Sequence, residues 1–296
     1  SNVGTGTQHG SGWAVAVAVA AAALAGCARP LLAPGNADWM GHWANYTPAV
    51  TWWKLDNGLV VAAARDDHVN AVDVRIRYDV GWADEGPGQR ELAHLVEHLL
   101  FAQPDEPGGP SVFARLSQST LAFNGETGLD ATTYWETALA PQLEGLIALE
   151  ARRLARGCTA IDAALLERER AVERAERDQH RGLGTEAADA ALYGPAAVRV
   201  GAGPGDDLDK LTLADVCAFI AKHYAPSTAT LAVTGRFEPE ELRRVVVREL
   251  GPLARGPARA RRSISIPALD GQVTGLSTPR HEPAAVVALA ASPVGS

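Results

Sequence analysis

Two histidines enclose a glutamate in the segment ELAHLVEHLLF, at positions His94, Glu97 and His98. Residues four apart lie on one face of an α-helix, so the two imidazoles can bind a single metal ion. Neutral imidazole nitrogens are common zinc ligands, and a nearby carboxylate can take a proton from a water at the metal. The spacing therefore favours a hydrolytic zinc centre. The alternative is a solvated helix face with incidental histidines, because so short a motif also recurs by chance.

The residues around this motif predict the helix that carries it, near residues 89–102. The aliphatic residues of the segment form one apolar arc, which can dock the helix on a core, and the three motif residues fall together on the opposite arc. The apolar arc consists of Leu92, Leu95, Val96, Leu99 and Leu100.

Strand signals dominate the first part of the chain and helix signals the later part, which predicts an α+β fold. Asp56-Asn57-Gly58 between apolar runs favours a hairpin, and AVDVRIRYDVG alternates like a half-buried strand. We expect a largely antiparallel sheet with helices packed on one face. Further strands are predicted near residues 121–126 and 131–139 and in TATLAVTG and AAVVALAAS, and helices near 110–119, 141–156, 161–180, 185–193, 211–223 and 239–250.

The order H-x-x-E-H inverts the more common zinc motif H-E-x-x-H. The stretch RYDVGWADEGPGQRELAHLVEHLLF resembles the metal-binding region of the pitrilysin and insulin-degrading enzyme family, which includes the mitochondrial processing peptidase. Gly81, Asp84, Glu85 and Gly88 match the glycine-and-acid turn that precedes the metal helix in that family.

The resemblance covers residues 49–255. Asn124 and Tyr134 match the asparagine-containing edge strand of the family, and Tyr224-x-Pro226 matches a later turn. It implies that the chain contains the metal-binding, N-terminal half of a pitrilysin-like peptidase.

The third metal ligand is not decided by composition. The segment LLERERAVERAERDQ offers several glutamates, and a helix laced with Glu–Arg pairs can simply face solvent. The family pattern of two glutamates seven residues apart selects Glu176, which lies 78 residues after His98, as the third ligand. By the same resemblance, Glu169 is a second carboxylate that orients the site. The competing glutamates are Glu167, Glu169, Glu173 and Glu176.

The resemblance implies a peptidase with one Zn²⁺ per domain, held by His94, His98 and Glu176, in which Glu97 moves the proton. Asn124 and its strand are then expected to pair with an extended peptide substrate, although a plain turn residue is an equal alternative. A non-catalytic scaffold or partner subunit of the same fold is the competing function. A structural zinc site is disfavoured, since such sites usually use four protein ligands.

The family closes its active chamber with a second, similarly folded half. We expect this half either later in the same polypeptide or in a separate partner subunit. The predicted organisation is a signal segment over 1–26, a tether over 27–48, the peptidase domain over 49–255, and a linker with the first strand of the second half over 256–296.

The apolar run from Trp13 to Gly26 ends at Cys27 and is too short to span a membrane. Leu24-Ala25-Gly26-Cys27 resembles a bacterial lipoprotein lipobox, which implies lipidation of Cys27 and a membrane-anchored periplasmic protein. A buried strand or helix is the alternative. Three widely spaced cysteines predict no disulfide framework. The net charge of −8 argues against nucleic acid as a partner.

Overall fold

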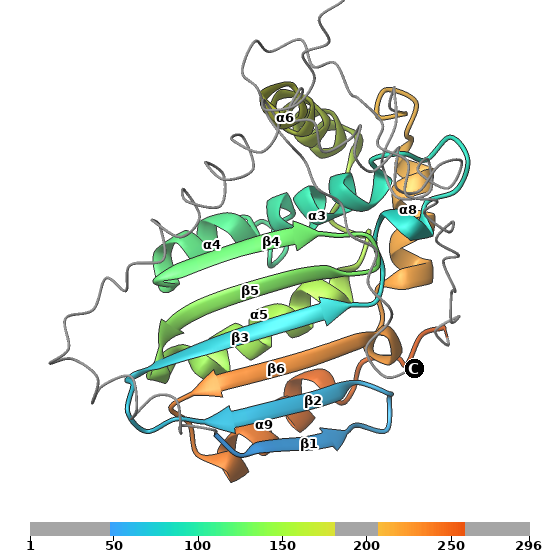
Figure 1. Cartoon of the computed structure of the whole chain (residues 1–296). Helices are drawn as coiled ribbons and strands as arrows, with labels where there is room; N and C mark the ends of the chain where they lie inside the picture. The colour runs from blue at the N-terminus through green and yellow to red at the C-terminus, as the bar shows by residue number, and fades with distance from the viewer. Residues whose placement is uncertain (1–47, 181–206, 258–296) are drawn as a thin grey trace, which may run out of the picture. The chain divides into compact units, whose positions relative to one another are not determined.

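A six-stranded sheet forms the centre of the computed structural model, which describes residues 48–180 and 207–257 (Figure 1). The strand order is β1-β2-β6-β3-β5-β4. Every neighbouring pair is antiparallel except β2 and β6, which run parallel. The strands are β1 (Val50–Lys54), β2 (Val60–Arg65), β3 (Ala71–Tyr78), β4 (Ala122–Thr127), β5 (Thr132–Leu139) and β6 (Ala229–Gly235).

The helices pack against one face of this sheet. Along β3, Val72, Val74, Ile76 and Tyr78 are buried, whereas the residues between them are more exposed. This alternation shows that one face is covered, and α5 and α9 lie behind the sheet in Figure 1. The predicted α+β fold is thereby confirmed. The helices are α3 (Leu92–Ala102), α4 (Val112–Ser119), α5 (Leu143–Arg156), α6 (Ala163–His180), α8 (Leu213–His223) and α9 (Pro239–Leu250), with short 3₁₀ turns at Trp82–Asp84, Ala140–Gln142 and Pro226–Thr228.

The hairpin predicted at Asn57-Gly58 joins β1 to β2. Gly58 has a φ of 97°, a conformation that glycine adopts without a steric penalty. The Asn57 side chain donates hydrogen bonds to the carbonyls of Leu250 (2.7 Å) and Leu253 (3.1 Å). The Asn57 side chain therefore also provides a hydrogen-bond donor for carbonyl groups at and just after the C-terminal end of α9, which have no partner within the helix.

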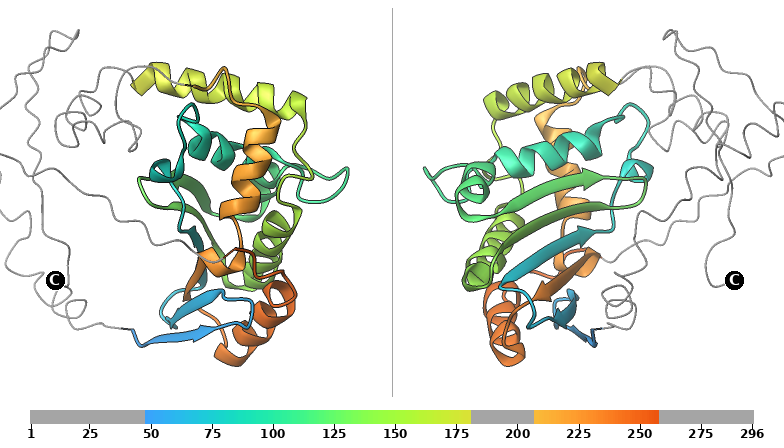
Figure 2. Two further views of the ribbon diagram at one scale, coloured as in Figure 1. Left: turned by 90° about the vertical axis from the view of Figure 1, so that its right-hand side faces the viewer. Right: turned by 60° about the vertical axis from the view of Figure 1, so that its left-hand side comes forward.

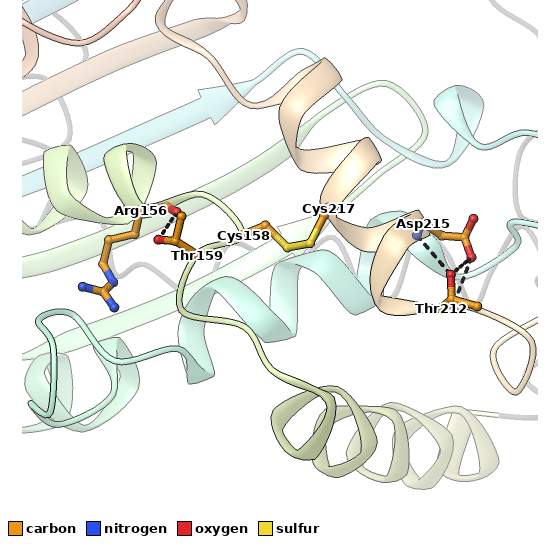
Figure 3. Close-up of a disulfide and its surroundings, with 6 residues drawn as sticks. All are labelled: Arg156, Cys158, Thr159, Thr212, Asp215 and Cys217. Atoms are coloured by element: carbon orange, nitrogen blue, oxygen red, sulfur yellow. Dashed lines mark hydrogen bonds between the residues drawn. A yellow bond between two sulfur atoms is a disulfide. The ribbon is translucent and has the colours of Figure 1, made fainter.

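Helix α6 lies over α3, beyond the β4 edge of the sheet, in both figures (Figure 2). The loop after α5 and helix α8 are joined by a disulfide between Cys158 and Cys217 (Figure 3). The expectation of no disulfide framework is therefore wrong for this pair. The two residues are 59 positions apart and their Cα atoms lie 5.2 Å apart. The packing of α8 against α3 helps to bring them together.

Several predicted features lie outside the described residues. These are the signal segment and Cys27, the helix near 185–193 and the strand AAVVALAAS. Within the described residues, no helix has both the length and the apolar character that crossing a membrane requires.

Candidate metal centre

The motif residues line a cleft of about 1060 Å³ bordered by α3, β4 and α6. On α3, the predicted apolar arc is buried, with exposed fractions of 2% or less. His94 and His98 project from the other side of the helix, where their side chains are 25% and 13% exposed. Burial of one arc therefore fixes which way the two imidazoles point.

The two imidazoles face each other through their Nε2 atoms, which are 3.2 Å apart. Glu176 on α6 brings Oε2 to 3.4 Å from His98 Nε2 and 3.9 Å from His94 Nε2. One potential ligand atom from each of the three side chains lies within 4.8 Å of the others. This donor set fits a zinc ion, since ligands about 2.0–2.2 Å from a shared ion have such separations.

Two further glutamates of α6, the half-buried Glu169 and the buried Glu173, approach the far sides of the imidazoles. Glu169 Oε2 lies 3.8 Å from His98 Nδ1, and Glu173 Oε1 lies 3.6 Å from His94 Nδ1. Burial, together with the nearby carboxylates of Glu91 and Glu85, raises the pKa of Glu173 to about 10. Glu167, the remaining candidate, is 65% exposed and pairs with Arg170. Of the four competing glutamates, Glu167 is thus turned away from the cleft.

Glu97 lines the same cleft as the two histidines and is only 7% exposed. Burial raises its pKa, while the Thr127 hydroxyl, which donates to Glu97 Oε2 at 2.7 Å, acts in the opposite direction. A Cβ added at Gly125 would lie 2.7 Å from Glu97 Oε1. The absence of a side chain at Gly125 therefore lets the carboxylate rest against β4.

Asn124 is an exposed residue of β4 that lines the same cleft. Because β4 is the last strand of the sheet, one of its edges is unpaired within the described residues. The rings of Phe101, Phe113 and Phe123 also line the cleft beside this strand. The structure thus places Asn124 where an extended chain can approach a sheet edge.

The turn before α3 is held by the residues that the resemblance singled out. Asp84 Oδ2 accepts the N–H of Gly81 at 3.0 Å, and Glu85 Oε1 accepts the N–H of Ala93 at 2.9 Å. A Cβ at Gly81 would overlap the backbone of Gly128 and Leu129. These contacts join the start of the metal helix to the loop after β4.

The buried carboxyl group of Glu85 should make the unfolding free energy of the chain depend on pH. Burial is the largest cause that raises its pKa from 4.5 to about 8. Below pH 4.5 the carboxyl is protonated in both the folded and the unfolded chain, and the penalty for ionising it in the fold grows up to pH 8. Relative to Glu85→Gln, the native chain should lose at most about 1.4 kcal/mol of unfolding free energy per pH unit in this window. Urea unfolding of both proteins at a series of pH values measures the difference; two parallel curves would contradict the expectation.

Comparison with known proteins shows which family this chain resembles. A model described as "Peptidase M16 inactive domain" matches residues 210–291. A probable mitochondrial-processing peptidase subunit beta of Schizosaccharomyces pombe is 24% identical over 70% of this chain and 46% of its own length. An uncharacterized zinc protease of Mycobacterium leprae is 27% identical over 67% of this chain and 45% of its own. The chain is thus similar to proteins of the M16 peptidase family.

The M16 fold is found again in the first half of the periplasmic protease PqqL from Escherichia coli. That structure superposes with a TM-score of 0.66 at 20% identity, over 74% of this chain and 49% of the other. The present chain spans about half the length of the curated relatives it matches. The segment matched as an inactive domain begins after the residues that form the candidate metal centre, 94–176.

The sequence did not predict three features around this site: the Thr127 hydroxyl on Glu97, the position of Glu173 behind His94, and the disulfide. Thr127 lies two positions after Gly125 and shares its face of β4, but its contact with Glu97 depends on how β4 packs against α3. Nothing in the local sequence distinguishes Glu173 from the glutamates that face solvent.

Proposed function

We propose that the chain carries the catalytic metal centre of a zinc peptidase that cleaves extended or unfolded peptides. The observation that carries the proposal is the convergence of His94, His98 and Glu176 in a cleft that the largely buried Glu97 also lines. The names of the relatives as zinc proteases support zinc as the metal. In this proposal the peptidase domain spans residues 49–255.

Bound zinc would supply Lewis acidity, lowering the pKa of a water and polarising the scissile carbonyl. His94, His98 and Glu176 would hold the ion. Glu97 would accept the proton of the attacking water and pass it to the leaving amine. Its low exposure and raised pKa suit this role, because a base whose pKa approaches the working pH can both take and return a proton. Glu169 would accept a hydrogen bond from His98 Nδ1 and keep that ring in place.

The unpaired edge of β4 is the proposed substrate-binding strand. A peptide that adds to a sheet edge is held by main-chain hydrogen bonds, so its sequence matters little. Asn124 offers both a donor and an acceptor beside that edge. The aromatic rings along the cleft would receive apolar substrate side chains. These contacts favour extended peptides over folded proteins.

Thr127→Val should lower kcat for peptide cleavage about 10- to 100-fold, since a hydrogen bond to a charged group contributes about 1.5–3 kcal/mol. Without this donor the pKa of Glu97 rises further, so the acidic limb of the pH–rate profile moves to higher pH. Zinc content should not change, because Thr127 touches no ligand. The neighbouring Thr133→Val serves as the matched control. A loss of rate with an unshifted acidic limb would mean that Thr127 does not act through Glu97.

The proposed function is tested by metal analysis and a peptide-cleavage screen. The purified chain should contain one zinc ion, and His94→Ala and Glu176→Ala should lose it. Quenched peptides without stable structure should be cleaved, and the activity should disappear with a chelator and return with zinc. A chain that binds no zinc under these conditions would exclude the proposal.

A non-catalytic member of the family is the second candidate function. The specific observation in its favour is the description of the matching family model as an inactive domain. The two candidates give different results in the screen. A non-catalytic protein would bind unfolded peptides with an affinity that is unchanged by His94→Ala, and would cleave none of them.

A second homologous half is the proposed partner of this domain, in the same polypeptide or as a separate subunit. The support is the length of the relatives, about twice the matched region, and the solved first half of PqqL. Adding such a half should raise peptide cleavage, since it would close the cleft and exclude water from the reacting groups. An unchanged rate after adding it would exclude this partner.

We propose a periplasmic location with a lipid anchor at Cys27. The Cys158–Cys217 disulfide supports an oxidising compartment, and the similar protein PqqL is named as periplasmic. Cys27→Ala should move the protein from the membrane fraction to the soluble fraction or leave it unprocessed. An unchanged distribution and mass would exclude the anchor.

A further inference from the structure

Glu173 is the most deeply buried acidic residue on α6. Its side chain has an exposed fraction of 0%, and neither carboxylate oxygen has a hydrogen-bond partner within the described residues. Burying a carboxyl group in this way costs stability, so native proteins rarely retain one without a role. Glu91 and Arg177 also lie near it, but the polar group whose contact is closest to hydrogen-bond range is the His94 ring, with Nδ1 at 3.6 Å from Oε1.

The two helices place their histidines and glutamates in matched pairs. His94 and His98 are four residues apart on α3, and Glu173 and Glu169 are four residues apart on α6. The later glutamate approaches the earlier histidine, and the earlier glutamate approaches the later one. Because the Nε2 atoms face each other, both Nδ1 atoms point outward, each toward one carboxylate.

We propose that Glu173 is a positioning residue of the metal centre, which accepts the Nδ1–H of His94 and so aims Nε2 at the metal. The inference rests on the proposed function, because it assigns His94 as a ligand. A ligand histidine usually donates its second ring N–H to a carboxylate or carbonyl, which fixes both tautomer and ring orientation. Either protonation state of Glu173 offers an acceptor oxygen.

The same residues do not form a second metal site. Glu91, His94 and Glu173 also bring potential ligand atoms within 4.8 Å of one another. However, a neutral imidazole has one free lone pair, and in the proposed site His94 would use it at Nε2, on the side of His98 and Glu176. Nδ1 then carries the proton and can donate a hydrogen bond, but it cannot bind a cation.

The test compares zinc affinity in Glu173→Leu, Glu173→Gln and the native chain, by competition with a chromophoric chelator. Glu173→Leu should weaken zinc binding about 10- to 100-fold, the usual effect of losing such an outer partner. Glu173→Gln keeps an acceptor oxygen and should stay within about threefold of the native affinity. Glu167→Leu, on the exposed side of the same helix, is the matched control and should not change it.

Thermal unfolding without zinc separates this role from simple damage. Replacing this buried carboxyl by an apolar chain of similar size removes its desolvation cost, so the Tm of Glu173→Leu should not fall even as its zinc affinity falls. Native zinc affinity in Glu173→Leu would overturn the inference, as would equal losses in Glu173→Gln and Glu173→Leu. Two zinc ions per native chain and one in Glu173→Leu would make Glu173 a ligand instead. If the native chain binds no zinc, the proposed function fails first.

Discussion

Glu97→Gln should reduce peptide cleavage about 10²- to 10⁴-fold, the usual contribution of a positioned general base. Gln has nearly the same shape as Glu and still accepts the hydrogen bond from Thr127, but it cannot take a proton. Zinc binding should persist, because the ligand atoms belong to His94, His98 and Glu176. The measurement is cleavage of a quenched peptide, with zinc content determined on the same samples.

The matched control for this change is Glu126→Gln, which removes a carboxylate from the same cleft without touching the histidines. Its rate should remain within a few-fold of the native rate. If Glu97→Gln lost its zinc, Glu97 would be acting as a ligand. If it kept both zinc and activity, some other group would be the base and the proposed mechanism would be wrong.

Periodicity predicted most individual elements of the fold. The alternation in β3 and the apolar arc of α3 both result from burial of one side of the element. Burial of one side produces a periodic pattern of apolar residues, which can be seen in the sequence. The place of β6 in the sheet is different. This strand pairs in parallel with β2 and antiparallel with β3. A pattern within one strand does not indicate which strand, more than 150 residues away in the sequence, will be its neighbour in the sheet.

The candidate site was predicted as far as its residues lie on one helix or match a family pattern. The grouping of His94 with His98 follows from the helical repeat, and the resemblance singled out Glu176. The structure brings these three side chains together, while their assignment as ligands stays a prediction. The contacts of Thr127 and Glu173 could not be predicted, because they depend on how β4 and α6 pack against α3.

The Cys158–Cys217 disulfide encloses the whole of α6, including Glu169, Glu173 and Glu176. Replacing both cysteines by alanine should lower the unfolding free energy by about 2–4 kcal/mol, since a long loop gains much conformational freedom in the unfolded chain. The same change should weaken zinc binding, because the disulfide joins the chain before α6 to the chain after it and so restricts the helix that carries Glu176. Urea unfolding and chelator competition measure the two effects.

Reduction of the native protein is the matched control, because it opens the same loop without changing the sequence. Reducing the native protein should reproduce the effect of the double replacement, while the double variant should not respond to the reductant. A double variant as stable as the native chain would mean that the bond does not constrain the unfolded state. A loss of stability with unchanged zinc affinity would show instead that contacts between α3 and α6, rather than the disulfide, hold Glu176 beside the two histidines.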